Sequence, residues 1–195
     1  YWTEKDLGPE NACPDCGRPT QYLEEKNYFF KMSEYQERLL AHIEANPEWI
    51  VPEERKNEIV GFLQQPLGDL SIPLPKSRVG WGIPLPFDDE HVAYVWVDAL
   101  INYLTASGAI DPSAAPDERG FDDVAESWWP CDLHLVGKDI IPSHAVYWPT
   151  LLMGVGLPVP RQILAHGWWV VGDTKMSKSL GNVIDPMALT DEFGP

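Results

Sequence analysis

Two lysines lie three residues apart in the segment VVGDTKMSKSLGN, between two glycines. Lys175 and Lys178 carry compact ammonium charges on flexible stems, which suit the shifting charge of a reacting polyphosphate. Gly172 and Gly181 flank them. A lone K-x-x-K is usually a solvated turn, but the complete string KMSKS favours phosphate chemistry.

Two predicted strand ends carry residues suited to the rest of a nucleotide. DLHLVGKDI predicts a buried strand over Leu133–Val136 that runs into Gly137, Lys138 and Asp139, and RQILAHG predicts a second strand that ends at His166. The helical segment between them predicts a βαβ unit with parallel strands, whose carboxyl ends bind ligands. The Asp139 carboxylate is suited to accept hydrogen bonds from a ribose, or simply to interact with the dipole of the next helix.

Apolar and aromatic residues recur at helical spacing on both sides of that unit. HVAYVWVDALINYLTASG is predicted to start as a strand and become helical, and IPSHAVYWPTLLMG is predicted to be a helix that Pro149 kinks. On each predicted helix these apolar and aromatic side chains share one face, which is either ordinary core or the wall of an apolar pocket. The residues concerned are Trp96, Ala99, Leu100 and Tyr103 on the first helix, and His144 and Trp148 on the second.

CPDCG near the start of the chain is a candidate metal knuckle. The tight turn can aim the thiolates of Cys13 and Cys16 at one ion. Two sulfurs make half of a tetrahedral zinc site, and no second pair follows nearby. The alternative is a bare turn with two small buried residues.

The remaining elements look like scaffold. Ser33 and Gln36 have the spacing of a capping box at the start of a helix that Asn46-Pro47 ends, and Pro52 opens a second helix. The proline- and glycine-rich residues 66–90 predict short extended pieces. We expect a domain boundary there, between residues 1–90 and 91–195.

Composition narrows the class of protein. The 195 residues hold 14 Lys+Arg against 30 Asp+Glu, a net charge of −16, which argues against a general nucleic-acid coat but leaves a local contact open. The most apolar run, residues 145–160, is short and broken by proline and glycine, so we expect no membrane partner. Three cysteines are too few for a disulfide scaffold, so we expect the protein to be located in the reducing cytoplasm.

The chain resembles the methionyl-tRNA synthetase family of class I aminoacyl-tRNA synthetases over nearly its whole length. The motifs that carry the resemblance are, in chain order, CPDCG, YVWVDALINYL, DLHLVGKDI, AVYWP, AHGWW and KMSKS. The resemblance implies an α/β fold. Residues 91–195 would form the second half of a Rossmann-like catalytic domain, with a parallel sheet and flanking helices. Residues 1–90 would be the remainder of a zinc-knuckle connective insertion. The implied activity is an ATP-dependent ligase that makes methionyl-adenylate and transfers methionine to tRNA(Met).

The same resemblance implies roles for individual residues. Lys175 and Lys178 would be catalytic, holding the triphosphate of ATP, which binds with Mg²⁺. Gly137, Lys138, Asp139 and His166 would complete the ATP site. The methionine pocket would consist of Trp96, Ala99, Leu100, Tyr103, His144 and Trp148. Cys13 and Cys16 would hold half of a structural Zn²⁺ site.

Some positions depart from the family pattern. Members usually carry a basic residue at Pro142, an aromatic residue at Ser143, and a Ser-Arg pair where this chain has Pro73-Leu74. A missing ring at 143 would open the pocket wall. The HIGH-type phosphate motif lies outside these residues, so we expect little activation by them alone. Two alternatives stay open: a class I synthetase for another apolar amino acid, and a non-catalytic zinc-knuckle RNA-binding module derived from one.

Overall fold

The structure, a computed structural model, describes residues 6–14, 17–22, 27–110 and 127–194. Its helices are α1 (Gln36–Ala45), α2 (Glu53–Leu63), α3 (Val95–Ala106), α4 (Trp148–Gly154) and α5 (Pro186–Phe193), with a π-helical turn η6 (Ser143–Tyr147) before α4 and 3-10 turns η2 (Pro9–Asn11), η3 (Met32–Tyr35), η5 (Lys138–Ile140) and η7 (Lys178–Leu180). Its strands are β1 (Phe29–Phe30), β2 (Ile50–Val51), β3 (Leu70–Ser71), β4 (Pro73–Pro75), β5 (Pro84–Leu85), β6 (Asp88–Ala93), β7 (His134–Gly137), β8 (Ile163–His166), β9 (Val170–Val171) and β10 (Thr174–Lys175).

A parallel sheet in the order β2-β8-β7 is the centre of the fold. The predicted βαβ unit is confirmed: β7 and β8 are parallel, with His134 opposite Ile163 and Gly137 opposite His166, and η5, η6 and α4 lie between them in sequence. Strand β2 joins β8 on its other side and was not predicted. It has only two residues, and its pairing with a strand more than a hundred residues away leaves no local signature.

The helices α1, α2 and α4 and the parallel sheet share one core. Leu39 and Ile43 of α1 and Ile59 and Leu63 of α2 are buried in the same cluster as Ile163 of β8. Trp49 anchors the turn before β2, because its indole N–H donates to the carbonyl of Pro160 at 2.7 Å. Side chains from both sides of residue 90 therefore build one core around the sheet, and the division at that residue stays a prediction.

The proline-rich segment forms short strands, as predicted. Strands β4, β6 and β5 make an antiparallel sheet, and β1 pairs with β3. Residue 90 lies inside β6, which runs almost directly into α3, so this small sheet sets the position at which α3 begins. Pro73 and Leu74 lie in β4 opposite Ala93 and Val92.

The predicted capping box at Ser33 is wrong. The Ser33 hydroxyl donates to Asp69 Oδ1 at 2.6 Å, and the Gln36 side chain donates to the carbonyl of Leu63 at 2.7 Å and accepts from the N–H of Leu67 at 2.8 Å. Both side chains bind the last residue of α2 or the segment that follows it, rather than the start of their own helix. Their tertiary hydrogen bonds tie α1 to the end of α2.

The helix after β7 changes its winding at Pro149. Proline has no N–H to donate and crowds the preceding turn, and the turn before it is π-helical, η6. The hydroxyl of Thr150 donates to the carbonyls of Val146 and Tyr147, each at 2.9 Å. The predicted disturbance at Pro149 is therefore a widened turn, which moves the residues of η6 relative to those of α4.

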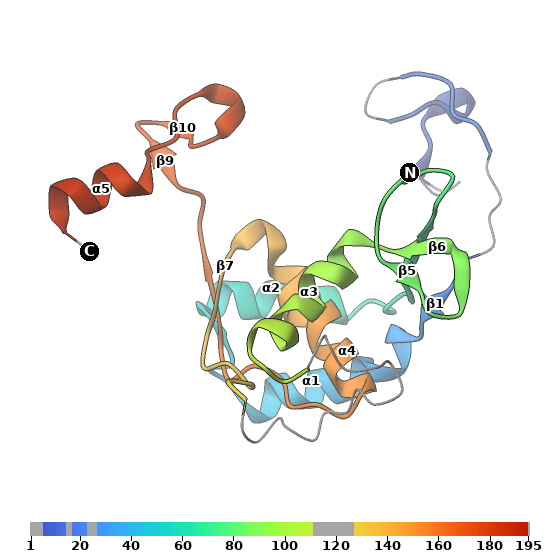
Figure 1. Ribbon diagram of the computed structural model, residues 1–195, viewed down its shortest axis with the longest axis horizontal. Helices are drawn as coiled ribbons and strands as arrows, with labels where there is room; N and C mark the ends of the chain where they lie inside the picture. The colour runs from blue at the N-terminus through green and yellow to red at the C-terminus, as the bar shows by residue number, and fades with distance from the viewer. Residues whose placement is uncertain (1–5, 15–16, 23–26, 111–126, 195) are drawn as a thin grey trace.

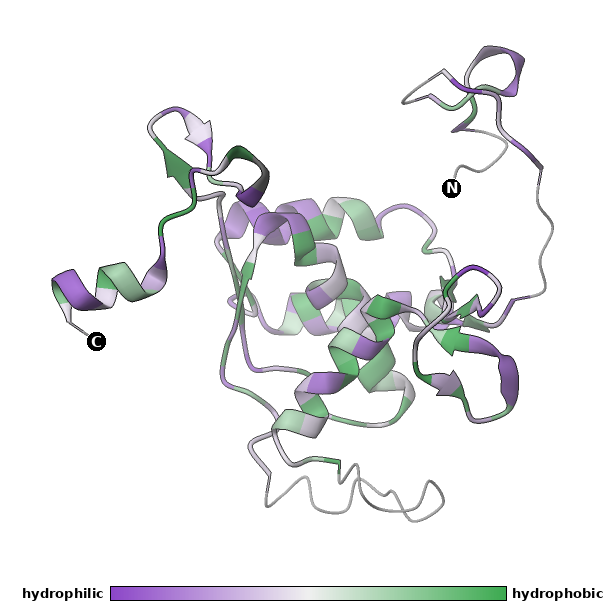
Figure 2. Cartoon of the chain, turned by 45° about the horizontal axis from the view of Figure 1, so that its top comes forward, coloured by the Kyte–Doolittle hydropathy of each residue, from purple (hydrophilic) through white to green (hydrophobic). Residues whose placement is uncertain are grey.

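Both ends of the chain project from the body that holds α1 to α4 (Figure 1). At one end lies η2, and at the other the hairpin of β9 and β10 is followed by α5. Figure 2 shows hydrophobic residues on β9 and α5, where Val170, Met187 and Phe193 are exposed. No helix in the described part of the chain combines the length and the apolar character that a bilayer crossing requires.

Candidate active site

The ends of β7 and β8 bring together residues predicted to bind ATP. Gly137 and His166 form the last pair of the ladder, and Lys138 and Asp139 follow directly in η5. A Cβ at Gly137 would lie 2.8 Å from Asp139 Oδ1, so the glycine makes room for that carboxylate. Nδ1 of His166 donates to the carbonyl of Gly167 at 2.6 Å, since a carbonyl can only accept.

The lysine loop meets these strand ends at Trp168. Lys175 lies opposite Val170 in the β9–β10 hairpin, and Trp168 lies two residues before Val170. The Lys175 ammonium lies 4.1 Å from the centroid of the Trp168 ring, and the Lys138 ammonium lies 4.2 Å from it. One indole therefore links the loop to the turn after β7. The sequence prediction did not include Trp168, although its position two residues after a strand end was a usable signal.

Lys178 sits apart from that contact. It is exposed at the start of η7, and among the described residues its ammonium has no ring or carboxylate partner. The loop is organised by Asn182, whose Oδ1 accepts from the N–H of Ser177 at 2.8 Å and whose Nδ2 donates to the carbonyl of Lys175 at 3.2 Å. Gly181 closes η7 with a left-handed φ of 66°, which favours glycine.

Tyr103 and His144 form a hydrogen bond between α3 and η6. His144 Nδ1 lies 3.0 Å from the carbonyl of Ile140, so this nitrogen carries the proton. Burial lowers the pKa of His144, which keeps the ring neutral and leaves Nε2 as an acceptor. The Tyr103 hydroxyl, 2.9 Å from Nε2, therefore donates to it. The pair presents an uncharged polar edge inside an apolar environment.

The rest of the predicted methionine pocket divides into two groups. Leu100 and Trp148 are buried in one cluster with Trp129, whose ring meets that of Trp148 edge to face at 5.5 Å. Trp96 and Ala99, on the first turns of α3, are exposed. The structure therefore brings together Leu100, Tyr103, His144 and Trp148. Trp96 and Ala99 are instead exposed to solvent at the beginning of α3.

Two buried polar atoms in this region have no hydrogen-bond partner among the described residues. They are Nε2 of His134 and Nε1 of Trp148, and both residues pack against the Tyr103 ring, at 4.5 Å and 6.1 Å between centroids. Burial, helped by the neighbouring His144, lowers the pKa of His134 to about 4. His134 was not predicted as a site residue, although its place on the inward face of β7 could have indicated it.

The knuckle is partly described. Gly17 adopts a φ of 67° and its N–H donates to the carbonyl of Cys13 at 2.8 Å, which closes the turn. Cys13 is a free, half-buried thiol, and Cys16 lies outside the described residues. Within the described ranges no group of three or more potential metal ligands comes together. The turn can offer sulfur ligands, but those present do not complete a zinc site.

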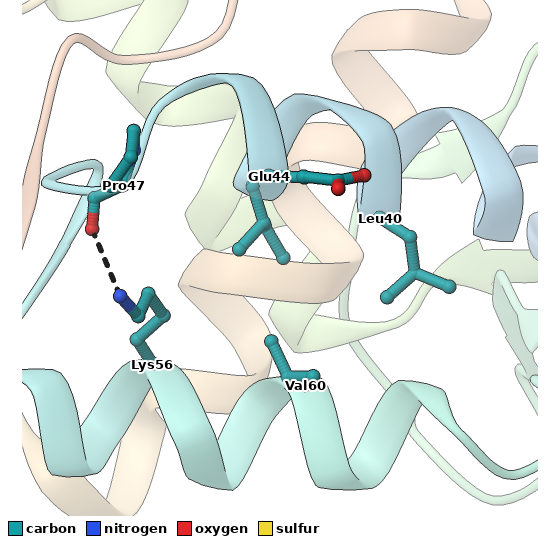
Figure 3. Close-up of a pocket in the computed structure, with 6 residues that line it drawn as sticks. Leu40, Glu44, Pro47, Lys56 and Val60 are labelled. Carbon is teal, nitrogen blue, oxygen red and sulfur yellow. Dashed lines mark hydrogen bonds between the residues drawn. The ribbon is translucent and has the colours of Figure 1, made fainter.

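A groove of about 420 Å³ between α1 and α2 contains none of the predicted site residues (Figure 3). It is lined by Leu40, Ile43, Glu44, Pro47, Lys56 and Val60. Lys56 is engaged by its own chain, because its ammonium donates to the carbonyl of Pro47 at 3.3 Å and lies 3.9 Å from Glu53. The ends of the parallel strands stay the predicted location of the site.

Comparison with known proteins identifies the family to which the chain is similar. The family described as tRNA synthetases class I (M) matches residues 4–195. The chain is 50% identical to methionine–tRNA ligase of Clostridium acetobutylicum over 195 residues, which is the whole chain and 29% of that protein. It is 50% identical to that of Streptomyces coelicolor over 191 residues, 98% of the chain and 34% of that protein.

A solved structure extends the similarity to the fold. Mycobacterium tuberculosis methionyl-tRNA synthetase bound by methionyl-adenylate superposes with a TM-score of 0.75 and 42% identity, over 99% of this chain and 36% of that one. The chain thus spans about a third of the length of the relatives it matches. Since sequence and fold agree over nearly all its residues, the chain belongs to the class I tRNA synthetases of the methionyl type.

Proposed function

We propose that the protein containing these residues is a methionine–tRNA ligase, and that this chain supplies its lysine loop and part of its methionine pocket. The observation that carries the proposal is the meeting of Lys175 and Lys138 on Trp168, at the strand ends where Gly137 lies opposite His166. The similarity to methionine–tRNA ligases over the whole chain supports the choice of amino acid.

In the first step, a carboxylate oxygen of methionine attacks the α-phosphorus of Mg²⁺-bound ATP, and pyrophosphate leaves. Such a displacement depends mainly on position and charge. Lys175 and Lys178 would bind the triphosphate and stabilise its charge, with Lys138 beside them. Gly137 would allow the adenosine to approach, and Asp139 would accept hydrogen bonds from its ribose.

The methionine side chain would lie against Tyr103, His144 and Trp148. A thioether is polarizable and gains about 0.3–1.5 kcal/mol from each aromatic contact. The neutral His144 ring offers no charge that would need solvent, which suits an apolar substrate. Trp96 and Ala99 would contact the ligand from the open turns of α3. Ser143 is buried at the first residue of η6, where the family pattern has an aromatic residue.

The second step would transfer methionine to tRNA(Met). A cytoplasmic location belongs to the same proposal, since the product serves translation and Cys13 and Cys131 are free thiols. Cys13 and Cys16 would hold a structural Zn²⁺ with ligands from elsewhere in the protein. Zinc content of the longer protein tests this last point: Cys13→Ser should lose the metal, whereas Cys131→Ser should keep it.

Amino-acid-dependent exchange of pyrophosphate into ATP tests the activity. We expect the longer protein to exchange with methionine and far more slowly with leucine or valine. Exchange with leucine or valine instead would indicate another class I synthetase. RNA binding without ATP or methionine binding would indicate a non-catalytic module. The 195 residues measured alone should be nearly inactive.

A further inference from the structure

Trp168 touches both lysines that lie at the strand ends, and no catalytic role was predicted for it. We propose that Trp168 is a positioning residue, which holds Lys138 and Lys175 as a preassembled pair of cations for the triphosphate of ATP. The inference rests on the proposed function. It adds a side chain that would act through the lysines rather than on the nucleotide.

The backbone explains why the three side chains meet. The ladder of β7 and β8 ends at Gly137 and His166, so Lys138 and Trp168 both follow within two residues of that end. The β9–β10 hairpin then returns the chain, and the N–H of Met176 donates to the carbonyl of Trp169 at 2.8 Å. The hairpin thereby returns Lys175 to the segment that holds Trp168, and its ammonium lies 4.1 Å from the centroid of the indole ring.

The charges of the two lysines are available to a ligand. In the described part of the chain neither ammonium forms an ion pair with a carboxylate, although the whole chain has 30 Asp+Glu against 14 Lys+Arg. Two like charges beside one another repel, and the electron-rich face of an indole offsets part of that cost. The indole provides this attraction without supplying an anion that would compete with phosphate.

The ring also leaves part of each ammonium group free for a ligand. A phosphate oxygen forms charge-assisted hydrogen bonds with an ammonium, which are stronger than its attraction to an exposed ring. Trp168 is 49% exposed, so an incoming triphosphate can reach the ammonium groups beside it. Trp168 would therefore keep the lysine loop near the strand ends before ATP binds, and would keep its ring contacts while the other N–H groups of the two ammonium groups bind ATP.

The experiment compares Trp168→Leu, Trp168→Phe and Trp81→Leu in the longer protein. Trp81 is a matched control, because it is 82% exposed in the turn between β4 and β5 and stacks on no described ring. Weakening one exposed cation–ring contact costs roughly 2- to 5-fold in binding. For two contacts we expect Trp168→Leu to raise KM for ATP by roughly 5- to 30-fold with KM for methionine unchanged. Trp168→Phe should restore most of the affinity.

Further readouts separate this inference from the proposed function. Binding of inorganic triphosphate, measured by calorimetry, should weaken in Trp168→Leu even if no amino acid supports exchange. Trypsin should cut after Lys175 faster in that variant when no ligand is present. The proposal is overturned if Trp168→Leu matches Trp81→Leu in triphosphate binding. It is also overturned if Phe and Leu behave alike, or if both KM values rise together with a lower melting temperature.

Discussion

The hydroxyl of Tyr103 lies 2.9 Å from Nε2 of His144, and this hydrogen bond joins α3 to the π-helical turn before α4. The carbonyl of Ile140 fixes the imidazole tautomer from the other side, at 3.0 Å from Nδ1. The bond therefore couples the two predicted walls of the methionine pocket, which are far apart in sequence.

Removing the Tyr103 hydroxyl should weaken methionine binding. Tyr103→Phe leaves Nε2 of the buried His144 without a donor, which costs about 1–3 kcal/mol. At about 1.4 kcal/mol per tenfold, we expect kcat/KM for methionine to fall on the order of 10-fold, with little change in KM for ATP. Exchange kinetics at varied methionine measure this. Tyr147→Phe is the control, since the Tyr147 hydroxyl bonds no described residue.

Gly137→Ala should damage ATP binding more than it damages the fold. The new Cβ would lie 2.8 Å from Asp139 Oδ1, and a carboxylate at the end of a side chain can move away. We expect KM for ATP to rise on the order of 10-fold, because Asp139 would lose its place at the strand end. Gly167→Ala serves for comparison, since nothing lies within 4 Å of a Cβ there. Equal KM values for the two variants would remove Asp139 from the site.

Local patterns were sufficient to predict the βαβ unit. The predicted strand Leu133–Val136 is offset by one residue from β7, and the segment RQILAHG contains β8, which ends at His166 as predicted. The helical spacing of Leu100 and Tyr103 predicted α3. These elements are set by a hydrophobic period and by glycine at a strand end, which are properties of neighbouring residues.

Features that depend on distant partners were missed. Strand β2 is recognisable only beside β8, and Ser33 prefers Asp69 to its own helix. Trp96 shares the helical spacing of Leu100 but is exposed, because α3 turns only part of that stripe toward α4. The contacts of Trp168 with Lys138 and Lys175 were not predicted, because the two lysines lie about 30 and 7 residues from it in the sequence.

The stability of the fold should fall in mild acid through His134. This histidine is 5% exposed, and burial lowers its pKa to about 4, against 6.5 in the unfolded chain. Between those values the unfolded state binds more protons, so stability is fully present above pH 6.5 and is lost as the pH falls toward 4. From pH 6.5 to 5 one such group removes up to about 2 kcal/mol.

His134→Phe keeps a ring against Tyr103 and removes the titrating nitrogen. We expect the variant to lose less free energy of unfolding than the parent protein between pH 6.5 and 5, measured by urea denaturation. Part of the slope should remain, because burial lowers the pKa of His144 and of His42 as well. If the two proteins lose the same amount, His134 is protonated in the fold and its buried nitrogen has a partner.

Two glycine-to-alanine changes in helices should have opposite signs. Gly61 lies in α2 with nothing within 4 Å of a Cβ, so Gly61→Ala should stabilise by about 0.5–1 kcal/mol through helix propensity alone. Gly154 ends α4, and its Cβ would lie 2.9 Å from Cε2 of Phe30 and 3.4 Å from the Tyr35 hydroxyl. The Phe30 and Tyr35 rings are stacked at 5.3 Å, so neither can yield alone.

Crowding should therefore outweigh propensity at Gly154, and Gly154→Ala should destabilise by about 1–3 kcal/mol in urea denaturation. Phe30→Leu in the same protein removes the ring atoms that the new methyl group meets, so the double variant should recover part of the loss beyond additivity. Stabilisation by Gly154→Ala would mean that β1 and η3 pack against α4 more loosely than the 2.9 Å approach indicates.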